Sequence, residues 1–209
     1  MKYLDEIINR LKAKYGENLS TELKHRNDVE LFVSVLLSPQ NTDKQVNKVT
    51  KELFKHFKTF NDYANANLKE LYKFIKSLNY YKHKAKYIKE SSKIIIENFN
   101  GKIPNNIDEL MLLPGVGRKV ANVILNELYN LNYGIVVDTH VNRVANRLGL
   151  VNSRDPLRVE RQLMNIVPKK YWHDFSHWLI RLGRDTCNAR NPKCNECILN
   201  DICPNSRVR

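Results

Sequence analysis

The sequence predicts an all-α fold with two lobes, on three observations. Apolar residues recur at three- and four-residue spacing in nearly every segment, which is the pattern of amphipathic helices. One such stripe is Val46, Val49, Leu53 and Phe57. The only strand-like run, residues 134–138, is too short to build a sheet. A chain of 209 residues with 42% hydrophobic residues can form one large domain or two small ones.

The N-terminal segment MKYLDEIINRLKAKYG, residues 1–16, is predicted to be a helix that packs on the core. Its apolar residues include Leu4, Ile7 and Leu11, and charged residues interrupt them, unlike the continuous apolar region of a signal peptide. The longest apolar run, LFVSVLL at 31–37, is far below the ~18 residues that a membrane span needs. We therefore expect a soluble, cytoplasmic protein with no membrane partner.

Further helix boundaries follow from capping residues. Asp155 followed by Pro156 is a typical helix start, with an N-cap side chain and a proline in the first turn. Gly149 and Gly183 stand where we expect the preceding helices to end. The chain has no internal repeat and no Gly/Ser linker, so we expect the lobe boundaries in tight loops.

The charge of the chain indicates a polyanionic partner. A formal net charge of +13 repels itself, and phosphate groups relieve that repulsion. Charge alone is equally compatible with a lysine-rich, solvated surface. Nucleic acid is therefore favoured as a partner, and further motifs must decide.

All four cysteines lie in the last 23 residues, and no secretory signal precedes them. Six, two and five residues separate them, in the order Cys187, Cys194, Cys197 and Cys203. Such clustering is typical of thiolates that bind metal rather than of disulfides. Structural zinc usually takes two CxxC pairs and this chain has one, so the spacing favours an iron–sulfur cluster and leaves zinc as the alternative. Arg190 and Lys193 lie in the first loop, so the metal would brace a basic segment at the surface.

The stretch LPGVGRKVANVIL, residues 113–125, is predicted to be a hairpin between two helices, with Pro114 opening the turn. Glycines adopt backbone angles that other residues avoid, and they let main-chain N–H groups approach a phosphate. The N-terminus of the following helix adds a positive dipole. A glycine turn also occurs for steric reasons alone. The residues expected at a nucleic-acid backbone are Leu113, Gly115, Val116 and Gly117.

Two residues are candidates for chemistry. Lys119 follows the hairpin, and a lysine nucleophile must lose its proton, which the helix N-terminus, the neighbouring Arg118 and partial burial of the side chain would favour. The alternative is a lysine that only contacts phosphate. Asp138 ends an apolar run and opens a helix, so it is either an N-cap alone or also a carboxylate that faces Lys119.

Together these motifs resemble the endonuclease III family of DNA glycosylases, in the helix-hairpin-helix superfamily, over nearly the whole chain. The matching stretches are TEL at 21–23, LLSPQNTD at 36–43, LPGVGRKVANVILN at 113–126, VDTHVNRVANRLG at 137–149, HWLIRLGRDTC at 177–187 and the cysteine spacing.

The resemblance implies a six-helix barrel with a helix-hairpin-helix at residues 21–130. A second helical lobe would join residues 1–20 to 131–209, with DNA in the groove between the lobes. The cysteines at 187–203 would hold a four-iron, four-sulfur cluster. The implied partner of a monomeric enzyme is double-stranded DNA that contains damaged bases or abasic sites.

The resemblance also implies an activity, that of a bifunctional DNA glycosylase and AP lyase of base excision repair. Lys119 would attack C1′ of an oxidised pyrimidine nucleotide turned out of the duplex, form a Schiff base, and cut the strand 3′ to the lesion by β-elimination. Asp138 would stabilise positive charge at the sugar. Gln40 would enter the gap left by the extruded nucleotide, and Tyr80 would lie in the loop that wedges the strands apart.

The sequence departs from the family pattern at Pro39, Asn79 and Tyr80, where a small residue, a glycine and a bulky aliphatic residue are common. These departures bear on lesion preference more than on the chemistry. The rival functions are a mismatch-specific glycosylase of the same superfamily and a non-catalytic helix-hairpin-helix DNA-binding protein. Adenine-specific relatives carry a glutamate at the position of Ser34, and the mismatch-specific types typically lack the lysine at position 119.

Overall fold

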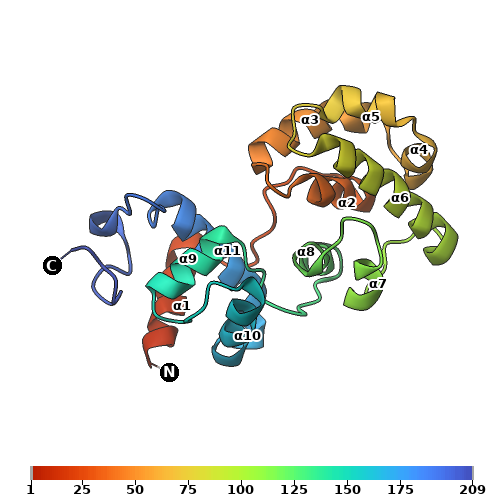
Figure 1. Ribbon diagram of the computed structural model, residues 1–209. Helices are drawn as coiled ribbons and strands as arrows, with labels where there is room; N and C mark the ends of the chain where they lie inside the picture. Colours follow the sequence, from red (N-terminus) through yellow and green to blue (C-terminus); the bar gives the residue numbers. More distant parts are fainter. Residues whose placement is uncertain (1, 209) are drawn as a thin grey trace. The chain divides into compact units, whose positions relative to one another are not determined.

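The computed structural model describes residues 2–208, which form eleven α-helices, two short 3₁₀-helices and no β-strand (Figure 1). The predicted all-α class is confirmed. No helix in this described range is long and apolar enough to cross a membrane. The chain divides into two compact units. One spans Thr21–Leu131, and the other joins the residues up to Ser20 to those from Asn132 onward.

The unit Thr21–Leu131 is built around α2, whose residues from Leu31 to Leu37 are each at most 3% exposed. A helix that is apolar on all sides is stable only when neighbours surround it. Helices α3, α6 and α8 pack directly against α2. The bounds are α2 Asp28–Leu37, α3 Asp43–His56, α4 Phe60–Asn65, α5 Leu68–Ile75, α6 Tyr81–Phe99, α7 Ile107–Met111 and α8 Arg118–Tyr129.

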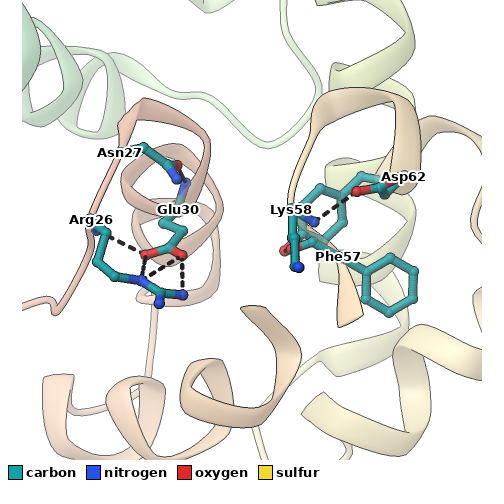
Figure 2. Close-up of polar contacts among 7 residues, drawn as sticks. Arg26, Asn27, Glu30, Phe57, Lys58 and Asp62 are labelled. Atoms are coloured by element: carbon teal, nitrogen blue, oxygen red, sulfur yellow. Dashed lines mark hydrogen bonds and ion pairs between the residues drawn. The ribbon is translucent and has the colours of Figure 1, made fainter. Parts of the chain in front are cut away.

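Side chains form hydrogen bonds to the backbone where these helices begin, and Figure 2 shows such bonds at the start of α2 and just before α4. The side chain of Asn27 accepts the N–H of Glu30 at 2.9 Å. The buried Glu30 carboxylate in turn accepts the backbone N–H of Arg26 at 2.8 Å and its guanidinium at 2.7 Å, so its charge is compensated. At α4 the carboxylate of Asp62 accepts the N–H of Lys58 at 2.8 Å. The Asn27 bond satisfies an N–H group in the first turn of α2, which has no intrahelical partner, and the bonds from Arg26 and Lys58 hold the residues just before each helix.

The second unit contains the N-terminal helix and the C-terminal third of the chain. The predicted packing helix is α1, Lys2–Tyr15, and Ile7, Ile8 and Leu11 are its buried residues. They pack in one core with Trp178, which is fully buried and donates its indole N–H to the carbonyl of Gly16 at 2.8 Å. The other elements are α9 Thr139–Arg147, α10 Pro156–Ile166, η1 Lys169–Tyr171, α11 Trp172–Asp185 and η2 Cys194–Glu196.

The helix boundaries predicted in this unit are confirmed except at one glycine. Asp155 is the N-cap of α10 and Pro156 its first residue, and Gly149 follows α9 with φ of +68°. The prediction that Gly183 ends a helix is wrong, because α11 continues to Asp185. A Cβ at position 183 would lie 3.0 Å from the Cβ of His140 on α9, so glycine is needed there for close helix packing.

Candidate functional site

The hairpin between α7 and α8 contains two glycines with different roles. Gly115 has φ of +81°, and a Cβ there would lie 2.7 Å from Cδ2 of Tyr87, so both backbone angle and space require glycine. Gly117 has φ of −87°, and no atom lies within 4 Å of the position of a Cβ. Glycine at 117 is therefore not needed for the fold, and its backbone is open to a ligand.

Leu113 and Val116 support the hairpin from inside. Their side chains are 2% and 5% exposed. Their N–H groups already donate to the carbonyls of Leu110 and Leu113, at 3.1 and 3.0 Å. The hydroxyl of Ser91 on α6 donates to the carbonyl of Pro114 at 2.9 Å and braces the turn. The outward-facing groups are thus the backbone of the two glycines and the side chain of Leu112, which is 71% exposed.

The N-terminus of α8 provides N–H groups beside this turn. The first intrahelical bond runs from the N–H of Ala121 to the carbonyl of Gly117 at 2.9 Å, and Gly117 supplies no side-chain cap. The N–H groups of Lys119 and Val120 therefore have no acceptor within the helix, as the first turn of any helix requires. Such groups bind anions. The side chain of Lys119 lies in this same turn and is exposed, so the expectation that it is partly buried is wrong.

Asp138 belongs to the other compact unit and caps α9, as predicted. Its Oδ1 accepts the N–H of Val141 at 2.7 Å, and the residue is half-buried. Ile135 and Val137, in the extended run before it, are buried and anchor its backbone in the core. One carboxylate oxygen is thus committed to the helix. No hydrogen bond to the other oxygen, Oδ2, is found among residues 2–208.

Gln40 lies in the loop between α2 and α3, exposed and with a left-handed φ of +59°. Its carbonyl accepts the side-chain amide of Asn79 at 2.7 Å. The backbone N–H of Asn79 donates to Oδ1 of Asn41 at 2.9 Å. Tyr80, the next residue, also has a left-handed φ, of +56°, and is 62% exposed. The two loops flagged by the sequence are therefore bonded to each other within one unit.

Sequence reasoning missed Lys84, which holds the Gln40 loop from beneath. Its side chain is 4% exposed, and its ammonium donates to the carbonyls of Leu37 and Pro39, both at 2.7 Å. Burial lowers the pKa of Lys84 to about 8. A signal was present in the sequence, because Lys84 precedes Ile88 by four residues and so lies on the buried side of α6.

The four cysteines line one cavity of about 200 Å³, and none of the four forms a disulfide. The loops that carry them are fixed by Arg147, which sequence reasoning also left without a role. Its guanidinium donates to Sγ of Cys187 at 3.2 Å and to the carbonyls of Asn188 and Ala189 at 2.7 and 2.8 Å. Four soft thiolate donors around a cavity that no side chain fills suit an iron–sulfur cluster. Arg190 and Lys193 are exposed in the loop between the first two cysteines. Nζ of Lys193 lies 3.7 Å from Oε2 of Glu196.

Two family models match the chain. The HhH-GPD superfamily base excision DNA repair protein model matches residues 33–169, and the iron-sulfur binding domain of endonuclease III matches residues 187–203. The second match runs from the first cysteine to the fourth. The cofactor of the chain is accordingly a four-iron, four-sulfur cluster rather than zinc.

Curated proteins and solved structures agree with these models. The chain is 47% identical to an endonuclease III of Bacillus subtilis over 90% of this chain and 86% of the relative. It is 41% identical to an endonuclease III of Synechocystis over 97% of this chain and 92% of the relative. A solved trapped covalent intermediate of an endonuclease III with DNA matches with a TM-score of 0.91 and 40% identity, over 98% of this chain and 96% of the other. The chain therefore belongs to the endonuclease III family of base excision repair DNA glycosylases and AP lyases.

Proposed function

We propose that Lys119 is the nucleophile with which this enzyme removes oxidised pyrimidines from double-stranded DNA. The observation that carries the proposal is the exposed position of Lys119 in the first turn of α8, beside the open backbone of Gly117. A covalent intermediate with DNA has been trapped for an endonuclease III that is 40% identical. Such an intermediate requires a nucleophilic side chain on the protein.

The proposed reaction has two covalent steps. The free amine of Lys119 attacks C1′ of the extruded nucleotide, the C1′–N bond breaks, and the base leaves with the bonding pair and a proton. The C1′–O4′ bond then breaks, O4′ takes the second amine proton, and a C1′=N bond forms, which is the Schiff base. Removal of a C2′ proton then breaks the C3′–O bond and expels the 3′ phosphate, which cuts the strand 3′ to the lesion.

In this proposal Asp138 stabilises the positive charge that develops on the sugar. Its Oδ1 caps α9, while Oδ2 accepts no hydrogen bond from the described residues. An ionised carboxylate with a free oxygen stabilises the positive charge that develops at C1′ and accepts protons in the later steps. The cap holds the side chain in one orientation, so the structural and catalytic roles support each other.

The remaining contacts bind DNA and hold the cluster. The backbone of Gly115 and Gly117 and the first turn of α8 receive a phosphate, with Leu113 and Val116 beneath them. Gln40 and Tyr80 enter the duplex. Arg190 and Lys193 contact phosphates. The bound cluster supplies iron–thiolate bonds that cross-link the loops of residues 187–203, through Cys187, Cys194, Cys197 and Cys203.

Borohydride reduction during turnover on thymine-glycol duplex DNA tests the proposal. The wild type should form a covalent enzyme–DNA adduct, and Lys119→Gln should form none, because only a Schiff base is reduced to a stable bond. Lys51→Gln, at an exposed lysine of α3, is the matched control and should trap like the wild type. An undiminished adduct in Lys119→Gln would assign the nucleophile elsewhere. Absence of an adduct in the wild type would instead favour a non-catalytic DNA-binding protein.

Monomeric action is part of the same proposal. The enzyme should elute at the mass of one chain, 24.5 kDa, in light scattering coupled to size exclusion.

A further inference from the structure

Two surface loops of the unit Thr21–Leu131 each place one exposed side chain on a left-handed backbone. Five described residues other than glycine have positive φ, and three of them are asparagine, the residue that tolerates this region well. The other two are Gln40 and Tyr80, with φ of +59° and +56°. Residues other than glycine and asparagine adopt left-handed backbone angles only where surrounding contacts hold them there. Residues with such angles cluster at functional sites.

Asn79 connects these two residues. Its side-chain amide donates to the carbonyl of Gln40 at 2.7 Å, and its backbone N–H donates to the side chain of Asn41 at 2.9 Å. Tyr80 follows Asn79 directly and is the N-cap residue of α6, so Asn79 bonds the segment just before α6 to the Gln40 loop. On the other side of the loop, the ammonium of Lys84 on α6 holds the carbonyl of Pro39 at 2.7 Å.

We infer that Asn79 is a positioning residue that joins the Gln40 and Tyr80 loops into one wedge, so that both side chains enter the duplex together. The inference rests on the proposed roles of Gln40 and Tyr80. A joined wedge fills the gap behind an extruded nucleotide without first ordering two separate loops, so less conformational entropy is lost when it inserts. The gain is largest where a paired, stacked base must be evicted and smallest where no base remains.

Asn79→Asp tests this inference directly. The substitution keeps the size of the side chain and the backbone N–H, but it places a carboxylate oxygen against the carbonyl of Gln40 in place of a donor. Excision of thymine glycol paired with adenine should fall about tenfold under single-turnover conditions, the scale of one lost hydrogen bond. Cleavage at a preformed abasic site should stay within about twofold, because no base has to leave the stack.

Asn65→Asp is the matched control for the added negative charge. Asn65 lies at the end of α4, is exposed, and also donates its amide to a backbone carbonyl, that of Asn61 at 3.0 Å. The Asn65→Asp variant should excise thymine glycol and cleave abasic sites like the wild type. Asn79→Gly is a second variant, since it keeps the N–H bond to Asn41 and removes only the bond to Gln40. Thermal unfolding verifies that each variant is folded.

A mutant cycle identifies the coupling. If Asn79 acts by positioning the side chains of Gln40 and Tyr80, then Asn79→Asp should have little further effect on excision in a background that lacks both, Gln40→Ala with Tyr80→Ala. An undiminished effect of Asn79→Asp in that background would overturn the inference, as would an unchanged ratio of excision to abasic-site cleavage in Asn79→Asp alone. Borohydride trapping on abasic DNA separates this failure from failure of the proposed function, because it reports only the Schiff base.

Discussion

At the scale of single residues, the two hairpin glycines separate folding from binding. Gly115 is required by its φ of +81° and by the ring of Tyr87, 2.7 Å from the position of a Cβ. Gly117 has a φ of −87°, which any residue can adopt, and no atom lies within 4 Å of the position that a Cβ would take. The same residue type therefore serves the fold at one position and the ligand at the other.

Alanine substitutions should show this difference. Gly115→Ala should lower the free energy of unfolding by about 1–3 kcal/mol, because a methyl group is forced into a left-handed backbone and against Tyr87. Gly117→Ala should change it by less than about 1 kcal/mol, yet weaken DNA binding, because the methyl group lies where a phosphate would approach. Urea unfolding and fluorescence anisotropy with a duplex measure the two quantities. Equal losses of stability in both variants would contradict this assignment.

At the scale of helices, α2 ends against a buried cation. Two backbone carbonyls lie there, that of Leu37, the last residue of α2, and that of Pro39. The ammonium of Lys84 donates to both carbonyls. The side-chain amide of Asn41 also donates to both, at 3.1 Å in each case. Carbonyls at a helix C-terminus carry partial negative charge, which favours the ammonium that burial disfavours. The loop that presents Gln40 thus begins at a fixed point.

Lys84→Met should alter how stability depends on pH. The pKa of Lys84 is about 8 in the native protein and 10.5 in the unfolded chain. Below pH 8 both states carry the proton, and between pH 8 and 10.5 only the unfolded chain keeps it. The free energy of unfolding of the wild type should therefore rise relative to Lys84→Met across this window, by about 3 kcal/mol in total.

Urea denaturation of both proteins at several pH values between 7 and 10.5 measures this difference. The variant retains the amide of Asn41 on both carbonyls, so it should remain folded. Parallel pH curves for the two proteins would show that burial of Lys84 does not perturb its titration.

The helices also show which features a sequence can predict. Helix starts depend on neighbouring residues, so Asp155 with Pro156 and the cap at Asp138 could be predicted correctly. Gly183 was misplaced because its contact is with His140 on another helix. Lys84 was missed because its acceptors lie 47 and 45 residues away in the chain. Features set by neighbouring residues could be predicted, whereas contacts between segments distant in the sequence depend on the folded structure.

At the scale of the whole molecule, the residues proposed for catalysis come from both compact units. Lys119 belongs to the unit Thr21–Leu131, and Asp138 belongs to the unit that contains both ends of the chain. The general attraction for DNA comes from charge, since 35 lysines and arginines exceed 22 acidic residues and give a net charge of +13.

Salt should therefore weaken binding steeply. If about five phosphates are neutralised, the affinity for undamaged duplex DNA should fall several hundred-fold between 50 and 200 mM salt, because binding releases condensed counterions. Arg190→Gln should lower the slope of log affinity against log salt by about one, since Arg190 is exposed in the loop that the cluster braces. Lys55→Gln is the control, because Lys55 already pairs with Glu52 at 2.8 Å, and it should leave the slope unchanged. Anisotropy titrations between 50 and 200 mM salt measure these slopes. If Arg190→Gln kept the wild-type slope of log affinity against log salt, Arg190 would not be a DNA contact.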